Sequence, residues 1–233
     1  MKRIAILQSN YIPWKGYFDI INSVDEFVLY DEVQYTKNDW RNRNQIKTVN
    51  GLQWLTIPVR RASLAQKINE TRTDGNCWRK KHWYSICQWY AKSSYLKTYR
   101  DHFEALYMGD DEENLSAINR AFINAVCKMI HIRARITSST DYHLSGGPSE
   151  RLLSLCQQAG ATSYLSGPAA KDYLDVDLFE SAGIEVAWMD YTGYPAYGQL
   201  YSPPFLHEVS IIDLILSEGG DKARKYMLSF KAG

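Results

Sequence analysis

Cationic, amide and aromatic side chains alternate between Asp31 and Asn44, which is the densest group of residues suited to binding chemistry in the chain. Lys37, Arg41 and Arg43 surround one acid, Asp39. In extended chain Arg41 and Arg43 point to one face. Guanidinium groups so placed suit a phosphate, and neighbouring rings suit a flat group that stacks. The residues predicted to bind such a ligand are Lys37, Asn38, Trp40, Arg41, Asn42 and Arg43. The alternative is a charged edge strand that resists aggregation.

A second candidate group follows the apolar run Ile4–Leu7. There Lys15-Gly16 stands at the start of a short predicted helix. Backbone N–H groups at a helix start and a nearby ammonium group can converge on a phosphate or carboxylate. The residues predicted to bind in this loop are Gln8, Asn10, Trp14, Lys15 and Gly16. A loop with a solvated lysine is the alternative.

A third candidate group lies where the predicted strand 162–166 ends, at Ser166 and Gly167. Ser166 and Gly167 are small enough to admit a ligand against the backbone, and Lys171 and Asp172 supply charge. An ordinary strand-to-helix turn is the alternative. Further on, the aromatic and proline-rich stretch 194–205 is predicted to cover a cleft or to be a packed connection.

Three residues are candidates for a general base: Asp31, His82 and Asp172. His82 lies four residues after Trp78 on the stripe of a predicted amphipathic helix. Histidine is suited to proton transfer in acyl or amino transfer near neutral pH. On an apolar stripe, however, a histidine is more often a hydrogen-bonded core residue.

Composition limits the classes of partner. Twenty-seven basic and 26 acidic residues leave a formal charge of +1, so no global field attracts nucleic acid. Single-stranded nucleic-acid binding through the many Tyr and Trp residues is therefore the least favoured hypothesis, and duplex nucleic acid is not expected. The four cysteines form no C-x-x-C pair and the five histidines match no metal spacing, so no metal site is predicted. The absence of a long apolar window or signal peptide predicts a cytoplasmic protein without membrane insertion.

The elements that must position these residues alternate between strand and helix. Strands are predicted at 4–7, 26–30, 133–137, 162–166 and 184–189, and helices at 17–22, 148–159, 177–182, 211–216 and 222–229. Asn50-Gly51 predicts an early β-hairpin. Helices at 77–90, 99–107 and 115–130, the first capped by Asn76, predict a helical insertion at about 76–130. The expected fold is a single α/β domain, residues 1–233, with a mostly parallel sheet and flanking helices.

Several of these stretches together resemble the WbqC-like protein family. They are Gln8–Phe18, Asp31–Asn44, Trp54–Val59, Trp78 with His82, Leu165–Leu174 and Val209–Leu214. The resemblance runs almost end to end, and Ser9 departs from it where a proline is expected. It implies a bacterial protein of O-antigen or surface-polysaccharide biosynthesis, a glycine transferase acting on an amino sugar.

A second resemblance concerns layout. The strand, proline-containing loop and helix that carry Trp14-Lys15-Gly16 are similar to the nucleotide-binding segment of nucleotidyltransferase-like (HUP-like) ligases. These ligases activate a carboxylate with ATP and pass it to an amine. Their two histidines are absent here, so Lys15, Lys37 and Arg41 would have to contact the phosphates.

Two hypotheses follow for the function. The first is an enzyme that transfers an acyl or aminoacyl group, such as glycyl, to the amine of a nucleotide-linked amino sugar. Its cofactor stays open: ATP with Mg²⁺, or another acyl donor. The second hypothesis is a non-catalytic protein that binds a nucleotide sugar or scaffolds a polysaccharide pathway. Neither hypothesis fixes the oligomeric state.

Overall fold

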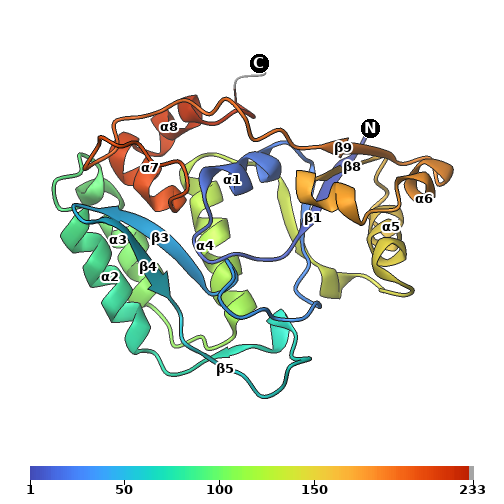
Figure 1. The fold of residues 1–233 in the computed structure, drawn as a ribbon, viewed down its shortest axis with the longest axis horizontal. Coiled ribbons are helices and arrows are strands. Elements are labelled where there is room, and N and C mark those ends of the chain that lie inside the picture. Colours follow the sequence, from blue (N-terminus) through green and yellow to red (C-terminus); the bar gives the residue numbers. More distant parts are fainter. Residues whose placement is uncertain (231–233) are drawn as a thin grey trace.

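Strand β1 (Arg3–Leu7) is the central strand of a five-stranded, all-parallel sheet in the computed structural model, which describes residues 1–230 (Figure 1). The strand order is β7-β2-β1-β8-β9. The other strands are β2 (Glu26–Leu29), β7 (Arg135–Ser138), β8 (Ser163–Ser166) and β9 (Glu185–Trp188). Apolar runs such as Phe27–Leu29 form these strands because both faces of the sheet are covered. The predicted α/β class with a mostly parallel sheet is confirmed.

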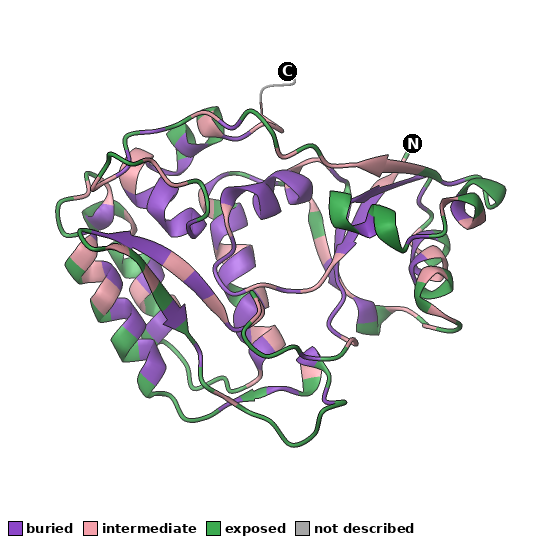
Figure 2. Cartoon of the chain, viewed as in Figure 1, coloured by how far each residue is buried: buried purple, intermediate pink, exposed green. Residues whose placement is uncertain are grey.

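Helices cover both faces of this sheet. Alternate residues of β1 point to opposite sides: Ala5 joins the larger core cluster with α1 and α4, whereas Ile4 and Ile6 join a smaller one with α5 and α6. The helices are α1 (Lys15–Asn22), α4 (Leu115–Met129), α5 (Pro148–Gln158) and α6 (Val176–Ser181). Figure 2 shows α1 and the core-facing side of α4 as largely buried.

The predicted hairpin is present, with its turn one residue earlier than expected. Strands β3 (Arg43–Thr48) and β4 (Gly51–Thr56) pair antiparallel, and Thr48 lies opposite Gly51. Of the predicted turn pair, only Gly51 has a positive φ, +97°. The arrangement therefore resembles a turn followed by a glycine bulge, in which one glycine supplies the left-handed residue.

The helical insertion contains α2 (Cys77–Trp89), α3 (Leu96–Met108) and α4, close to the predicted ranges. Asn76 occupies the N-cap position of α2 as predicted, but its side chain makes no capping bond and donates instead to Asp111 Oδ1 at 3.4 Å. Two-residue strands β5 (Val59–Arg60) and β6 (Arg72–Thr73) pair before the insertion.

The chain ends with α7 (Ile211–Glu218) and the short α8 (Gly220–Ala223). Ser210 caps α7 by accepting from the Ile212 N–H, as its spacing predicts. The helix expected at 222–229 is only α8 with one 3₁₀ turn, because Met227 is fully buried and residues 228 and 229 donate backbone N–H groups to Asp19.

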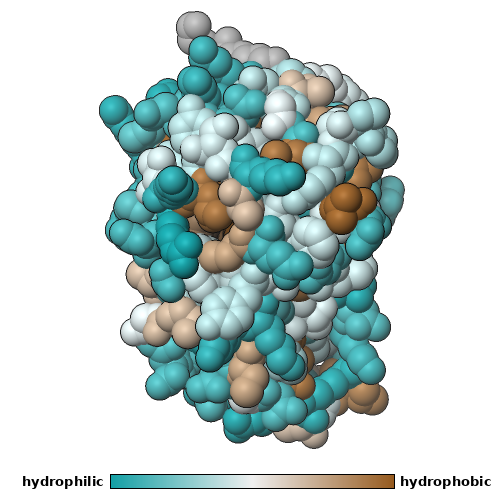
Figure 3. All heavy atoms as spheres, turned by 90° about the vertical axis from the view of Figure 1, so that its left-hand side faces the viewer, coloured by the Kyte–Doolittle hydropathy of each residue, from teal (hydrophilic) through white to brown (hydrophobic). Residues whose placement is uncertain are grey.

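The face seen in Figure 3 is mostly hydrophilic, with small separate hydrophobic spots. Among residues 1–230, no helix has the length and apolar character needed to cross a membrane.

Glu26 is a buried carboxylate at the start of β2, and its environment predicts that the fold loses stability in acid. Burial alone would raise its pKa, but hydrogen bonds from Lys2, Tyr142 and Thr137 outweigh burial and lower the pKa. Its stabilising effect is complete above the ordinary glutamate pKa and is lost as the pH falls through the lowered value. We expect Glu26→Gln to destabilise the fold by about 1–3 kcal/mol at neutral pH. Urea unfolding at several pH values should show this difference shrinking in acid; a constant difference would contradict it.

Candidate ligand-binding site

The strand order places a crevice at the carboxyl end of β1. Strands β1 and β8 are neighbours, and the chain leaves β1 toward α1 on one face but leaves β8 toward α6 on the other. Ligands of open α/β sheets bind at such switch points. Two cavities adjoin this point, and the loop Gln8–Trp14 contributes residues to the lining of both.

The first, here called the aromatic cavity, has a volume of about 510 Å³. Its rings are Trp14, Trp40, Tyr191 and Tyr194. Its polar side chains are Asn10, Asn44, His207 and Glu208. The Trp14 ring lies 5.3 Å from Tyr191 and 5.5 Å from Tyr194, centroid to centroid. Aromatic walls with a few polar groups are typical of sites that orient a small ligand.

Hydrogen bonds connect the loop after β1 to the segment before β3. Tyr11 N–H donates to the Trp40 carbonyl at 3.0 Å, and the Arg41 guanidinium donates to Asn10 Oδ1. Asn44 Nδ2 donates to the carbonyls of Tyr11 and Ile12 at 3.1 and 2.9 Å. The two motifs that looked separate in the sequence thus form one wall, which includes Asn10, Trp14 and Trp40.

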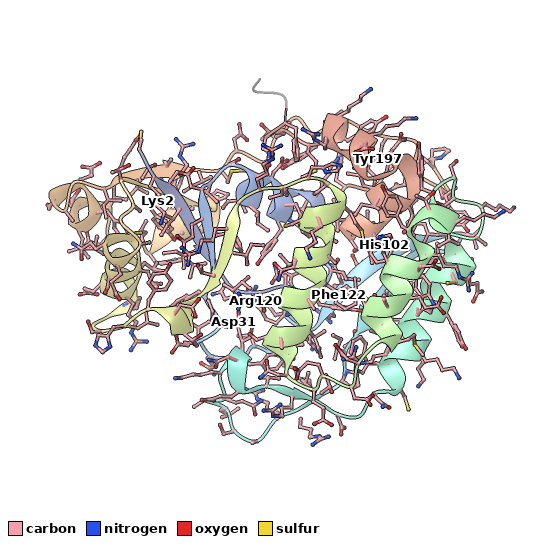
Figure 4. All side chains as sticks on the ribbon, turned by 180° about the vertical axis from the view of Figure 1, so that it is seen from behind. Lys2, Asp31, His102, Arg120, Phe122 and Tyr197 are labelled. Carbon is pink, nitrogen blue, oxygen red and sulfur yellow. The ribbon has the colours of Figure 1, made fainter. Side chains whose placement is uncertain are left out.

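Asp31 holds this wall in place through hydrogen bonds to the loop after β1 and to α4. Its Oδ1 accepts the Ser9 N–H at 2.7 Å, and its Oδ2 accepts the Ser116 hydroxyl of α4. Asn119, one turn further along α4, donates to Ser9 Oγ at 3.0 Å. Figure 4 shows Asp31 beside α4. Asp31 is 4% exposed, so its place in the structure is that of a loop support.

We expect Asp31→Ala to destabilise the fold by about 1–3 kcal/mol, because the Ser9 N–H and the Ser116 hydroxyl lose their acceptor. Asp101→Ala, at an exposed position on α3, is the matched control and should stay within about 0.5 kcal/mol. Denaturant unfolding measures both. Equal stability of the two variants would show that Asp31 does not hold the loop.

His82 is a residue of α2, and its side chain lies in the core, where it faces the loop after β1. Its Nδ1 is 2.9 Å from the Tyr11 hydroxyl, and burial lowers its pKa to about 4, opposed by a hydrogen bond to the Thr56 backbone. The imidazole is 6% exposed and lines neither cavity. In this position it packs against Trp78 and orients Tyr11.

The predicted cations do not converge on one cavity. Lys15 is buried; its Nζ donates to the Pro195 carbonyl at 3.1 Å and lies 4.9 Å from the Tyr194 ring centroid. The Arg43 guanidinium stacks on Trp54 at 4.1 Å, and Lys37 is exposed. Of the four, only Lys15 and Arg41 reach residues that line the aromatic cavity, Tyr194 and Asn10 respectively.

Gly16 and Asn42 have roles in shaping this region. A Cβ on Gly16 would lie 2.3 Å from the Trp14 ring, so glycine lets the indole pack against the start of α1. Asn42 is buried and donates to the Ile57 carbonyl at 2.8 Å. The exposed Asn38 adopts φ +61° and accepts from Arg43 through its carbonyl.

The second cavity, here called the switch-point cavity, has a volume of about 600 Å³ and contains Gln8, Ser166 and Gly167 in its lining. Lys171 and Asp172 are exposed on the 3₁₀ turn Pro168–Asp172 and do not line it. The Lys171 ammonium lies 5.6 Å from the Trp188 ring centroid.

His207 and Glu208 are the residues that sequence reasoning missed. They belong to the loop after the aromatic stretch 194–205, which does border a cavity through Tyr194. His207 is exposed at the edge of the cavity; partial burial, and then the charge of Lys15, lower its pKa, which favours the neutral imidazole. The proline-rich aromatic stretch was the signal that could have led to them.

A metal site has no support in the described part of the chain. Within residues 1–230, no group of three or more His, Cys, Asp or Glu side chains is placed to hold a metal ion.

Comparisons with known proteins agree with the family resemblance. The model of the WbqC-like protein family matches residues 8–225. A similar protein, the uncharacterized protein Rv1507c of Mycobacterium tuberculosis, is 48% identical over 222 residues, which is 95% of this chain and 96% of that protein. No solved structure gives a significant match. With almost the whole chain matched, this protein belongs to the WbqC-like protein family.

Proposed function

We propose that the protein is an enzyme that transfers an aminoacyl group, such as glycyl, from an activated donor to the amine of a nucleotide-linked amino sugar. The observation that carries the proposal is the aromatic cavity, whose lining combines aromatic rings and side-chain amides with the His207 imidazole, a group whose pKa is lowered toward the neutral form. This combination offers both a surface for a sugar and an acceptor for a proton.

Recognition of the sugar is assigned to Trp14, Trp40 and Asn10. An aromatic ring offers a flat apolar surface to the C–H face of a pyranose, and side-chain amides hydrogen-bond hydroxyl groups. Because Arg41 holds Asn10 Oδ1, the Nδ2 group of Asn10 is left as the donor toward the ligand. Glu208 lies in the same cavity and suits a sugar hydroxyl or an ammonium group.

The chemical step needs a base and an activated acyl group. The sugar amine attacks the acyl carbonyl carbon, a C–N bond forms, and the bond to the leaving group breaks. The donor class is an acyl adenylate or a thioester, which releases the nucleotide or the thiol. His207 accepts the proton from the attacking nitrogen.

The test is an incubation of the protein with a panel of dTDP- and UDP-linked amino sugars and glycine, activated either by ATP with Mg²⁺ or as a thioester. Mass spectrometry should show one sugar nucleotide gaining a glycyl group in an amide linkage. Absence of any gain across the panel, with binding of a sugar nucleotide still measurable, would favour the second candidate function, a non-catalytic sugar-binding protein.

That second candidate has one observation in its favour. Two of the bases predicted from sequence, Asp31 and His82, are occupied by structural hydrogen bonds. A binding protein needs no base. An enzyme does, and because Asp31 and His82 are engaged elsewhere, the proposed transfer depends on His207.

A further inference from the structure

We infer that the switch-point cavity binds a nucleoside phosphate. This inference deepens the proposed function by giving the nucleotide its own site, next to the aromatic cavity that would take the sugar.

The position and the size fit a nucleotide. The cavity lies at the carboxyl ends of β1, β2 and β8, where Leu7, Tyr30 and Ser166 contribute to its lining. Its volume of about 600 Å³ is within the range of small-molecule and cofactor sites. In an open parallel sheet this edge is where ligands bind.

The glycine at position 167 points to a ligand, because nothing in the protein itself requires a glycine there. Its φ of −72° and ψ of 153° are ordinary for any residue, and a Cβ there would have one neighbour within 4 Å, the Tyr191 hydroxyl at 4.0 Å. Neither backbone conformation nor packing therefore requires glycine at this point. A ligand lying against the backbone at the end of β8 would require it, since any side chain would occupy the ligand's space.

One end of the cavity suits the phosphate. Helix α5 begins there with Gly147 and Pro148, and its first-turn N–H groups carry the positive end of the helix dipole. Arg151 lines the same end, and its Nε donates to the Gly146 carbonyl at 2.9 Å, which fixes the guanidinium at the rim. The Glu150 carboxylate lies close to Gly147 and competes with an anion for this end.

The apolar and aromatic part of the lining suits the ring of the nucleoside. Its apolar residues include Ile6 and Leu152. Tyr173 stands at the rim with 65% of its surface exposed, unusual for so large an aromatic side chain, and presents a ring for stacking.

The two cavities approach each other at Gly167. This residue lines the switch-point cavity, and the group nearest to its missing side chain, the Tyr191 hydroxyl, belongs to a residue that lines the aromatic cavity. A nucleotide in one cavity and a sugar in the other could therefore belong to one molecule.

The experiment is calorimetric titration of the full chain with UDP, dTDP, ADP and ATP, each with Mg²⁺. Gly167→Val should abolish measurable binding, because valine adopts the same φ and ψ and fills the ligand's place. Arg151→Ala should weaken binding by about 10- to 100-fold, as expected for the loss of a charge-assisted hydrogen bond. Glu150→Gln should strengthen it. Arg133→Ala, at an exposed position before β7, is the control and should bind as the unchanged protein does.

Preference for UDP or dTDP would assign the cavity to the sugar nucleotide, and preference for ADP or ATP would assign it to donor activation; both support the site. Binding that Gly167→Val and Arg151→Ala leave unchanged, in variants with unaltered thermal unfolding, would overturn it, and so would no binding of any of the four. His207→Ala should bind nucleotide normally. Absence of glycyl transfer by the unchanged protein, with nucleotide binding intact, would therefore count against the proposed function and leave this inference standing.

Discussion

Replacing His207 by alanine is expected to lower the kcat of amide formation by about 10²- to 10⁴-fold, the usual contribution of a positioned general base. KM for the amino sugar should change little, because the rings and Asn10 that hold the sugar are unaltered. The expected loss follows from the position of His207 in the aromatic cavity and from its neutral state. Steady-state kinetics of the sugar nucleotide found by mass spectrometry measures it.

The pH profile distinguishes a proton acceptor from a structural residue. Because burial and Lys15 lower the pKa of His207 below its usual value of about 6.5, the unchanged enzyme should lose activity only in more acidic solution, as the imidazole becomes protonated. His207→Ala should lack this acidic limb. His143→Ala, another exposed histidine, is the control. Equal kcat and equal pH profiles for the two variants would remove His207 from the mechanism.

Asp213→Ala is expected to destabilise the fold by about 3–5 kcal/mol, the usual result of removing one member of a buried charged network. Asp213 is fully buried on α7, and its carboxylate accepts the hydroxyls of Tyr90 and Tyr197 and the amide of Gln199. Burial raises its pKa, and these hydrogen bonds oppose that rise. Figure 4 shows Tyr197 beside α7.

A buried cation depends on the same network. Lys47 Nζ donates to Gln199 Oε1 at 2.8 Å and to the Pro204 carbonyl, and burial lowers the pKa of Lys47 while Asp213 opposes this change. The network holds the 194–205 stretch against the hairpin, so Asp213→Ala should also weaken ligand binding in the aromatic cavity. The control is Asp221→Ala, at an exposed position on α8. Its free energy of unfolding should lie within about 0.5 kcal/mol of that of the unchanged protein. Similar unfolding midpoints for both variants would contradict this role.

The periodic elements of the fold could be predicted because each has a local cause. Continuous apolar runs become β1 and β2, whose two faces are buried, and the Pro148 start of α5 follows from proline's fixed φ. Where the prediction failed, tertiary contacts decided. Residues 228 and 229 donate to Asp19, more than 200 positions away in the chain, and this contact replaces the last turns of the expected helix.

The site could be predicted only in part, because spacing does not show which way a side chain faces. The motifs around Asn10 and Arg41 do meet. Lys15, however, turns into the rings of the C-terminal stretch, and His82 turns toward Tyr11 in the core. His207 follows the aromatic stretch 194–205, whose composition indicated a cleft, but its place beside Asn10 and Trp40 depends on contacts between distant segments that spacing does not show.

The most direct measurement follows the indole N–H signals of the seven tryptophans by NMR during titration with dTDP- and UDP-linked amino sugars. The predicted result is that the signals of Trp14 and Trp40 shift, because these two rings line the aromatic cavity, whereas those of Trp78 and Trp83, buried in the core, stay in place. Shifts at Trp78 and Trp83 with Trp14 and Trp40 unmoved would show that the sugar binds elsewhere.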